Sequence, residues 1–137
     1  MFYHPKEREN VRELLSISQR LRAELVIVPR PTGRNLCSLA RCVDLEDVKA
    51  LVSGSTVVVL ETTGIDILQV PLHDLCKGPL SIVVGAEDYG VPPQAILSLN
   101  PSYVIRLPMS VAGASYNVVS SLVILLTHLE IACSSGS

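Results

Sequence analysis

The sequence is short of charged and aromatic side chains, and it contains no long hydrophobic run. Of its 137 residues, 18% are charged and 4% are aromatic, whereas 48% are hydrophobic. The longest fully apolar run, residues 122–126, is far too short to span a bilayer, and the polar first residues argue against a signal peptide. We therefore expect a single cytoplasmic domain over residues 1–137, with no membrane contact and with apolar surface that meets a partner chain.

Signatures of metal and nucleotide sites are missing as well. The four cysteines, Cys37, Cys42, Cys76 and Cys133, form no C-x-x-C pair, and no histidine stands at ligand spacing from one of them. This pattern argues against a zinc site and favours buried thiols in a reducing cytosol. There is also no Walker motif and no G-x-G-x-x-G, which leaves little support for a domain that binds some other nucleotide or phosphate.

The net charge of −2 is spread unevenly along the chain. Residues 1–41 hold eight basic and four acidic side chains, a net charge of +4, and the remainder holds three basic and nine acidic ones, a net charge of −6. The basic third could be a surface that faces phosphates, or a solvated helix face with internal ion pairs. Because the whole chain is not basic, nucleic acid is permitted as a partner rather than required.

Apolar residues at strand spacing and at helix spacing alternate along the chain. Short apolar runs predict buried strands at residues 25–28, 56–60, 80–84 and 103–107. Helices are expected at residues 9–22, with Asn10 as the N-cap, and at residues 44–52, 93–99 and 115–131. This alternation predicts an α/β fold with a mainly parallel sheet and helices on both faces.

The last expected helix, residues 115–131, is apolar almost all round. A helix at the surface needs a polar face, so this one is expected to be buried on two sides. One side can be covered by its own sheet. The other is covered most simply by a second copy of the chain in a two-fold dimer, although the N-terminal helix of the same chain could cover it instead.

The chain is organised around residues 80–92. A buried strand ends at Gly85, and the glycines Gly85 and Gly90 flank the acidic pair Glu87 and Asp88. Glycine permits positive φ and the close approach of a ligand or of another backbone segment. Open α/β sheets bind ligands at such loops, beyond the carboxyl ends of their strands, although this loop could also be an ordinary turn with solvated acids.

Three segments of the chain resemble one family. Residues 82–91 give a hydrophobic strand and G-x-E-x-x-G, residues 105–109 give an I-P-M-like strand end, and residues 115–118 read S-Y-N-V where the family has S-L-N-V. In order and spacing they resemble the SpoU/TrmH branch of the SPOUT RNA methyltransferases. The resemblance covers roughly residues 78–137, and upstream only Phe2 and Tyr3 could form the family's opening strand.

The resemblance implies a fold, a cofactor and a reaction. Family members have a deep C-terminal trefoil knot, a rare exception to the rule against knotted chains. They bind S-adenosylmethionine, form homodimers through the first and last helices, and methylate ribose 2′-hydroxyls of tRNA or rRNA. The positions that match the cofactor site are Thr62, Thr63, Gly64, Gly85, Glu87, Gly90, Ile105, Leu107, Pro108, Ser115 and Asn117.

The resemblance also implies catalytic residues, with one departure from the pattern. Asn10, Glu87, Ser115 and Asn117 match catalytic positions, although Ser115 could simply be an N-cap and Asn117 an early-turn polar residue. Ser16 stands where the family has an arginine that activates the hydroxyl. Arg20, one turn further along, is expected to replace it. The other candidates, which are otherwise expected to bind RNA, are Arg12, Arg30 and Arg34.

Two functions follow from this pattern. The first is S-adenosylmethionine-dependent methyl transfer to a ribose 2′-hydroxyl of tRNA or rRNA by a homodimer. The second is a catalytically inactive knotted homodimer that binds S-adenosylmethionine, RNA or both, which Ser16 and the short opening strand favour. Because no separate RNA-binding domain is visible, target choice would come from the dimer surface or from an accessory RNA-binding subunit.

Overall fold

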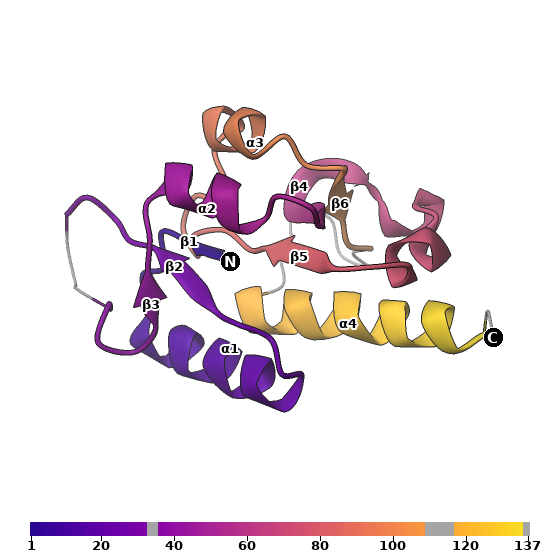
Figure 1. Cartoon of the computed structure of the whole chain (residues 1–137), viewed down its shortest axis with the longest axis horizontal. Coiled ribbons are helices and arrows are strands. Elements are labelled where there is room, and N and C mark those ends of the chain that lie inside the picture. Colours follow the sequence, from indigo (N-terminus) through magenta and orange to yellow (C-terminus); the bar gives the residue numbers. More distant parts are fainter. Residues whose placement is uncertain (33–35, 109–116, 136–137) are drawn as a thin grey trace.

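Strands and helices alternate along the chain, as the sequence predicts. The computed structural model describes residues 1–32, 36–108 and 117–135. Figure 1 labels the elements, which are β1 (Phe2–Tyr3), α1 (Arg8–Arg20), β2 (Val26–Val28), β3 (Arg41–Cys42), α2 (Leu45–Leu51), β4 (Thr56–Asp66), η1 (Ile67–Gln69), η2 (Leu72–Cys76), β5 (Leu80–Val83), α3 (Pro93–Leu99), β6 (Tyr103–Arg106) and α4 (Val118–Ser135). The α/β class is confirmed.

The strands form two parallel three-stranded sheets that meet along one seam. Their orders are β1-β2-β3 and β5-β4-β6, and the strand pairings within both are parallel. At the seam, Phe2 forms a parallel bridge with Val84, just beyond the end of β5. The Tyr3 N–H donates to the Val84 carbonyl at 2.8 Å, and the Val84 N–H donates to the Met1 carbonyl at 2.9 Å. The strands therefore run in the order β3-β2-β1-β5-β4-β6.

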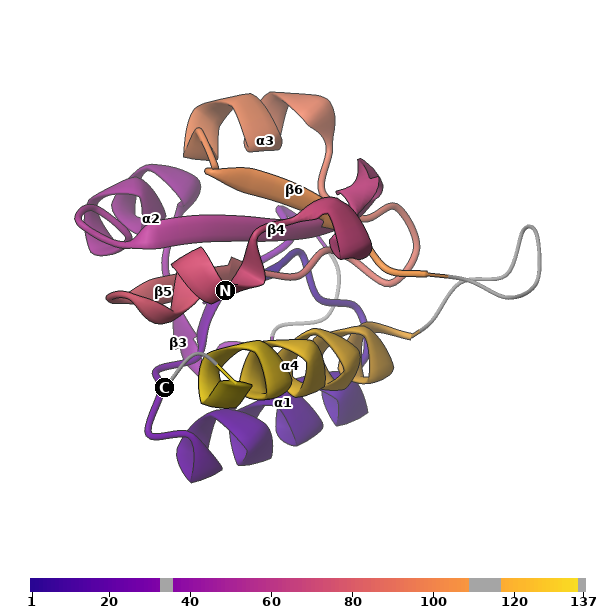
Figure 2. The same ribbon diagram turned by 90° about the vertical axis from the view of Figure 1, so that its right-hand side faces the viewer.

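Helices cover both faces of this surface. Helices α2 and α3 lie on one side, and α1 and α4 lie together on the other (Figures 1 and 2). Alternate strand residues face opposite layers: Val58 and Leu60 of β4 join the core under α1 and α4, whereas Val57 and Val59 join the core under α2 and α3. The prediction of helices on both faces is confirmed.

Several boundaries differ from the sequence prediction. Helix α1 begins at Arg8, after Glu7, so Asn10 is not its N-cap. Strand β3 was not predicted, because two residues, Arg41 and Cys42, pair only with β2 and carry no strand-length pattern. Strand β4 continues past residue 60 to Asp66 through an irregularity in its pairing with β6. The predicted first residues of the last helix, 115 and 116, lie outside the described residues.

The prediction of buried thiols is wrong. Disulfides join Cys37 to Cys42 and Cys76 to Cys133, and Cys37, Cys76 and Cys133 are exposed. The second bond connects η2 to the C-terminal turn of α4. Their Cα separations of 5.4 and 5.6 Å suit a disulfide, and folding rather than sequence spacing creates that proximity. None of the described helices combines the length and the hydropathy that crossing a membrane requires.

Candidate functional site

A cleft of about 490 Å³ opens where the carboxyl ends of β4, β5 and β6 meet the first turns of α1 and α4. This volume lies in the range of small-molecule sites, and the location is the one where open parallel sheets bind ligands. The predicted site residues that line the cleft are Asn10, Thr62, Gly85, Glu87, Gly90, Ile105, Leu107 and Asn117. Three sequence segments predicted to share one site therefore converge.

Other predicted residues lie elsewhere. Thr63, Gly64 and Pro108 do not line the cleft, although Thr63 and Pro108 adjoin lining residues in the sequence. The arginines predicted to act in catalysis or RNA binding, namely Arg12, Arg20 and Arg30, do not line it either. Ser115 and Arg34 lie outside the described residues. The structure thus brings together most of the predicted cofactor residues but none of these three cations.

The cleft combines an apolar floor with polar walls. Leu60, Val84, Ile105 and Leu107 line it and are all buried in the fold. Among the described residues, the acidic residues Glu7, Glu61, Glu87 and Asp88 and one basic residue, Arg106, also line it. The cleft therefore suits a ligand that has a flat apolar ring with polar edges and a positively charged group. The apolar floor would remove water from the ring, and the acids would attract the positive charge.

The loop between β5 and α3 closes on itself through its two glycines. The Ala86 N–H donates to the Gly90 carbonyl at 3.2 Å, and the Gly90 N–H donates back to the Ala86 carbonyl at 2.8 Å. Gly90 has a φ of +68°, and a Cβ on Gly85 would lie 2.5 Å from the carbonyl carbon of Gly90. Both positions therefore require glycine for the loop's own geometry.

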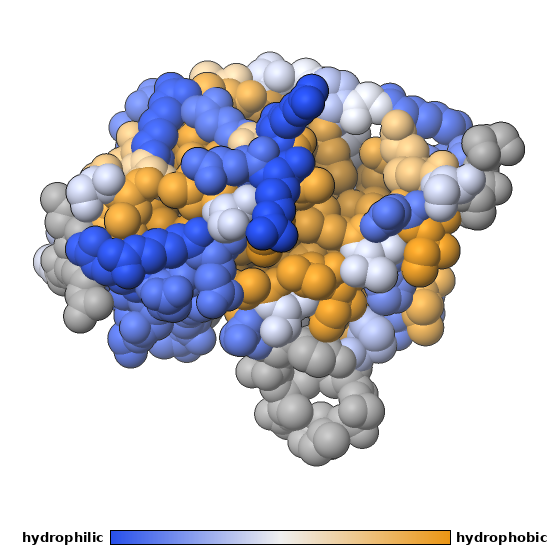
Figure 3. Space-filling model, turned by 90° about the horizontal axis from the view of Figure 1, so that it is seen from below, coloured by the Kyte–Doolittle hydropathy of each residue, from blue (hydrophilic) through white to orange (hydrophobic). Residues whose placement is uncertain are grey.

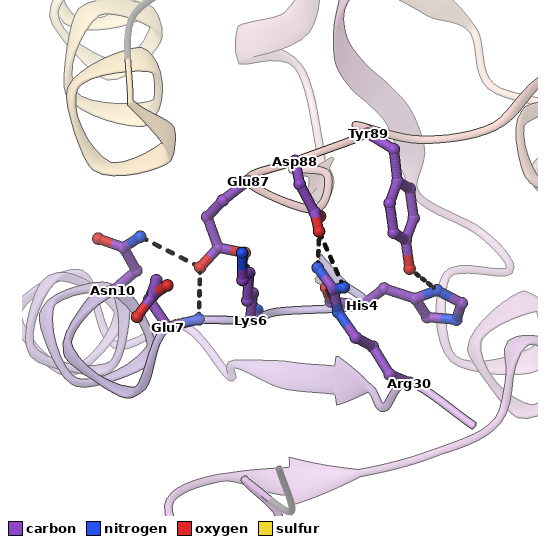
Figure 4. A network of polar contacts seen from close by, with 8 residues as sticks. All are labelled: His4, Lys6, Glu7, Asn10, Arg30, Glu87, Asp88 and Tyr89. Carbon is purple, nitrogen blue, oxygen red and sulfur yellow. Dashed lines mark hydrogen bonds and ion pairs between the residues drawn. The ribbon is translucent and has the colours of Figure 1, made fainter. Parts of the chain in front are cut away.

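Glu87 joins this loop to the start of α1. Its carboxylate accepts the backbone N–H groups of Lys6 and Glu7, each at 2.8 Å, and the Nδ2 of Asn10 at 3.1 Å (Figure 4). The N-terminus of a helix carries unpaired N–H groups and a partial positive charge, so a carboxylate is favoured there. Glu87 thus takes the place of the side-chain cap that α1 lacks, and Asn10 braces it.

Glu61 holds the other side of the loop through its carboxylate, as Glu87 does at the start of α1. Its carboxylate accepts the N–H of Val91 at 2.8 Å and the N–H and hydroxyl of Thr62 at 3.1 and 3.2 Å. Glu61 was not predicted as a site residue. The available signal was its position as the first polar residue after the buried run of β4, at the same edge as Glu87.

The outer part of the loop is held by Arg30. Its Nη1 donates to Asp88 at 3.0 Å, its Nε donates to the His4 carbonyl at 3.0 Å, and its guanidinium carbon lies 4.8 Å from the centre of the Tyr89 ring. Hydrogen bonding by Arg30 lowers the pKa of Asp88. Burial, and then the charge of Arg30, lowers the pKa of His4, whose Nδ1 lies 2.6 Å from the Tyr89 hydroxyl. Arg30 therefore positions the loop (Figure 4).

Comparison with known proteins decides the fold. No protein-family model and no curated protein matches the sequence. A solved structure from Bacillus anthracis, assigned as an RNA methyltransferase, is 17% identical, has a TM-score of 0.75, and covers 97% of this chain and 92% of its own. The S-adenosylmethionine-bound rRNA methyltransferase of Sinorhizobium meliloti is 18% identical, with a TM-score of 0.71, 95% of this chain covered and 54% of its own. An RNA 2′-O-ribose methyltransferase is 16% identical, with a TM-score of 0.68, and the match covers 96% of this chain and 56% of that structure.

This chain has the SpoU/TrmH methyltransferase fold. The chain spans little more than half the length of the S. meliloti structure and of the RNA 2′-O-ribose methyltransferase. At this level of identity the likeness concerns the fold, because folds host sites of different function.

Within the SpoU/TrmH fold, Arg12 and Arg20 of α1 do not line the cleft. Ser16 is exposed on the helix, and Arg12 lies 3.7 Å from Glu9 in an exposed ion pair. Arg20 follows Asn10 by ten residues, which corresponds to about 15 Å along a helix. Arg20 therefore does not line the cleft of its own chain, and its predicted role in place of Ser16 stays a prediction.

Helix α4 begins at the other wall of the cleft. The Ser120 N–H donates to Asn117 Oδ1 at 2.8 Å, so Asn117 caps the helix. Asn117, Val118 and Ser121 all line the cleft. Asn117 is thus a polar residue at the start of α4, which it caps, and it also lines the cleft; its role toward a ligand stays a prediction.

Proposed function

We propose that this protein binds S-adenosylmethionine in the cleft and transfers its methyl group to a ribose 2′-hydroxyl of tRNA or rRNA. The observation that carries the proposal is the convergence of residues 60–62, 84–90 and 105–107 on one cleft. These segments include the ones that resemble the family's cofactor loops. The S-adenosylmethionine-bound S. meliloti structure has the same fold, and the 2′-O-ribose methyltransferase supports the ribose hydroxyl as acceptor.

The residues of the cleft fit this cofactor. Leu60 and Leu107 offer an apolar bed for the adenine ring, and the acids Glu7 and Glu61 favour a sulfonium cation. When bound, the cofactor supplies a methyl group that is already activated. The remaining work of the chain is to orient the ribose oxygen and to ease its proton away.

We assign the orienting part to residues at the cleft and the stabilisation of the developing ribose oxyanion to a cation, while the released proton passes to solvent. Asn117 stands at the start of α4, and Asn10 and Glu87 stand opposite at the start of α1. Ser115, two positions before Asn117 in the sequence, is assigned to the same part. Arg20 would take the arginine's part only in a second chain's cleft. Arg12 and Arg34 are assigned to RNA contact, and Arg30 would join them only by exchanging its bond to Asp88.

A knotted homodimer completes this proposal. Helices α1 and α4 border an apolar groove of about 360 Å³ that includes Leu14, Leu21 and Leu122. Val123 and Ile131 of α4 remain 46% and 64% exposed, and Figure 3 shows hydrophobic residues gathered over this face. Such a surface favours burial against a second copy. An accessory subunit would then supply any further RNA recognition.

One observation favours the inactive alternative, a homodimer that binds S-adenosylmethionine or RNA without transfer. Ser16 is a short exposed side chain at the position where the resemblance expects the activating arginine. A cleft that holds the cofactor without a cation to polarise the hydroxyl would bind without catalysing.

Calorimetric titration with S-adenosylmethionine, and with S-adenosylhomocysteine in parallel, tests the proposal. We expect saturable one-site binding by the wild type and at least tenfold weaker binding by Asn117→Ala, which removes a polar group from the wall. Gln94→Ala, an exposed position outside the cleft, is the matched control. Absence of binding in a folded wild-type sample would contradict the proposal.

Methyl transfer then separates the two functions. The wild type is incubated with tritiated S-adenosylmethionine and unfractionated tRNA or rRNA, and label in nuclease-resistant 2′-O-methylated dinucleotides is counted. Label above the no-enzyme level supports the methyltransferase. Cofactor binding with no label in either RNA supports the inactive homodimer.

A further inference from the structure

Arg106 occupies a distinctive position at the cleft. In β6 it lies between Ile105 and Leu107, whose side chains are buried in the core under α1 and α4. Because side chains alternate along a strand, Arg106 points away from that core, and 49% of its side chain is exposed. Among the described residues it is the only lysine or arginine that lines the cleft.

Arg106 forms only a weak ion pair, with Asp66. Asp66 is paired with Arg106 in the register of β4 and β6, and the nearest side-chain N···O distance is 3.7 Å. This is longer than a hydrogen bond, and the pair is partly exposed, so its net contribution is small. Oδ1 of Asp66 already accepts the Leu68 N–H at 2.9 Å. The guanidinium therefore keeps donors that a stronger anion can take.

The charges around Arg106 indicate which kind of anion would bind its free donors. The other charged side chains that line the cleft are acidic, namely Glu7, Glu61, Glu87 and Asp88. These acids repel a polyanion, so RNA can bring a ribose to the cleft only if a cation at the rim attracts its backbone. Arg30 cannot serve while Asp88 holds it. A guanidinium matches phosphate geometry and is the preferred residue for such contacts.

We propose that Arg106 is an RNA-phosphate-binding residue, which takes a backbone phosphate of the substrate at the rim of the cleft in exchange for Asp66. This inference rests on the proposed function, because it needs RNA as the substrate. It adds a cation that the sequence comparison did not indicate, and it places the RNA backbone on the β6 side of the cleft.

The test measures binding of unfractionated tRNA and of rRNA over a series of salt concentrations, with S-adenosylmethionine titrated separately. For Arg106→Ala we expect about tenfold weaker RNA binding at low salt and a slope of log Kd against log salt reduced by about one. Affinity for S-adenosylmethionine should remain unchanged. Arg106→Lys should recover part of the affinity and the full slope.

Two further variants complete the design. Asp66→Asn keeps the oxygen that accepts from Leu68 and removes the competing charge, so RNA affinity should rise about threefold. Arg41→Ala is the matched control, since Arg41 is similarly exposed and ion-paired, to Glu24, and does not line the cleft. It should leave both affinities unchanged.

The possible failures are distinguishable. If the wild type binds RNA and S-adenosylmethionine while Arg106→Ala keeps the wild-type RNA affinity and slope, the role of Arg106 is wrong and the proposed function stands. If Arg106→Ala loses S-adenosylmethionine instead of RNA, the guanidinium binds the cofactor's carboxylate, and the inference is again overturned. If the wild type binds neither ligand, the proposed function fails and the inference fails with it.

Discussion

The two halves of the sheet are built differently. In β5-β4-β6, β4 has eleven residues and its neighbours have four each, whereas β1, β2 and β3 have two or three residues each. The long half also provides the loops that form most of the cleft. The short half adds only the start of α1, through Glu7 and Asn10.

The short half depends on the seam with the long half. Phe2 bridges to Val84, and the loop beyond Val84 sends Glu87 to the start of α1 and Asp88 to Arg30. The acidic loop that looks like a ligand loop in the sequence is therefore also the joint between the two halves. The comparison teaches that one loop both lines the cleft, through residues 85–88 and Gly90, and joins the two halves, through Glu87 and Asp88.

Breaking the seam should have the largest effect. Phe2 is fully buried in the core under α1 and α4, and Phe2→Ala should lower the free energy of unfolding by roughly 3–5 kcal/mol, because it leaves a cavity where the halves meet. Urea denaturation followed by circular dichroism measures this. Leu97→Ala, at a side chain that is 79% exposed in the long half, should change it by less than about 0.5 kcal/mol. Equal losses would contradict a special role for the seam.

The long half could be predicted from the sequence because its elements have strong local patterns. The apolar run of β4 is buried, those of β5 and β6 are mostly half-buried, and α3 falls on its predicted residues, 93–99. The position of the cleft could be predicted because loops that follow parallel strands meet at one edge of the sheet. Thr62, Gly85 and Leu107, which the resemblance to the SpoU/TrmH family predicted as site residues, line this cleft.

The short half could not be predicted to the same extent, because distant partners define it. Strand β3 exists only through pairing with β2, and the cap of α1 is a carboxylate 80 residues away from Glu7. Asn10 was interpreted as a cap because local spacing gave it no other partner. The same limit applies to Arg106 and Asp66, which an irregularity in β4 brings into register, and to the disulfides.

The disulfides sharpen the comparison, because one lies in each half. Cys76–Cys133 closes 57 residues and Cys37–Cys42 closes five. A chain-entropy account then gives losses of about 4 and about 2 kcal/mol when each is removed. Cys76→Ser/Cys133→Ser should therefore lower the melting temperature about twice as much as Cys37→Ser/Cys42→Ser. Differential scanning calorimetry, with the wild type in reductant as the reference for both losses together, checks this order. The reverse order would show that loop length does not govern these bonds.

The smallest of these effects separates the two roles of the acidic loop. Glu87→Ala removes the acceptor for the N–H groups of Lys6 and Glu7 and should cost about 2 kcal/mol of unfolding free energy in urea. Glu13→Ala, at an exposed acid further along α1, should cost almost nothing. If Glu87 only joins the halves, the folded variant should bind S-adenosylmethionine in calorimetry with the wild-type Kd, because the glycines alone close the loop. A Kd raised more than tenfold at the same stability would mean instead that the carboxylate contacts the cofactor, and the seam and the site would then share a side chain as well as a loop.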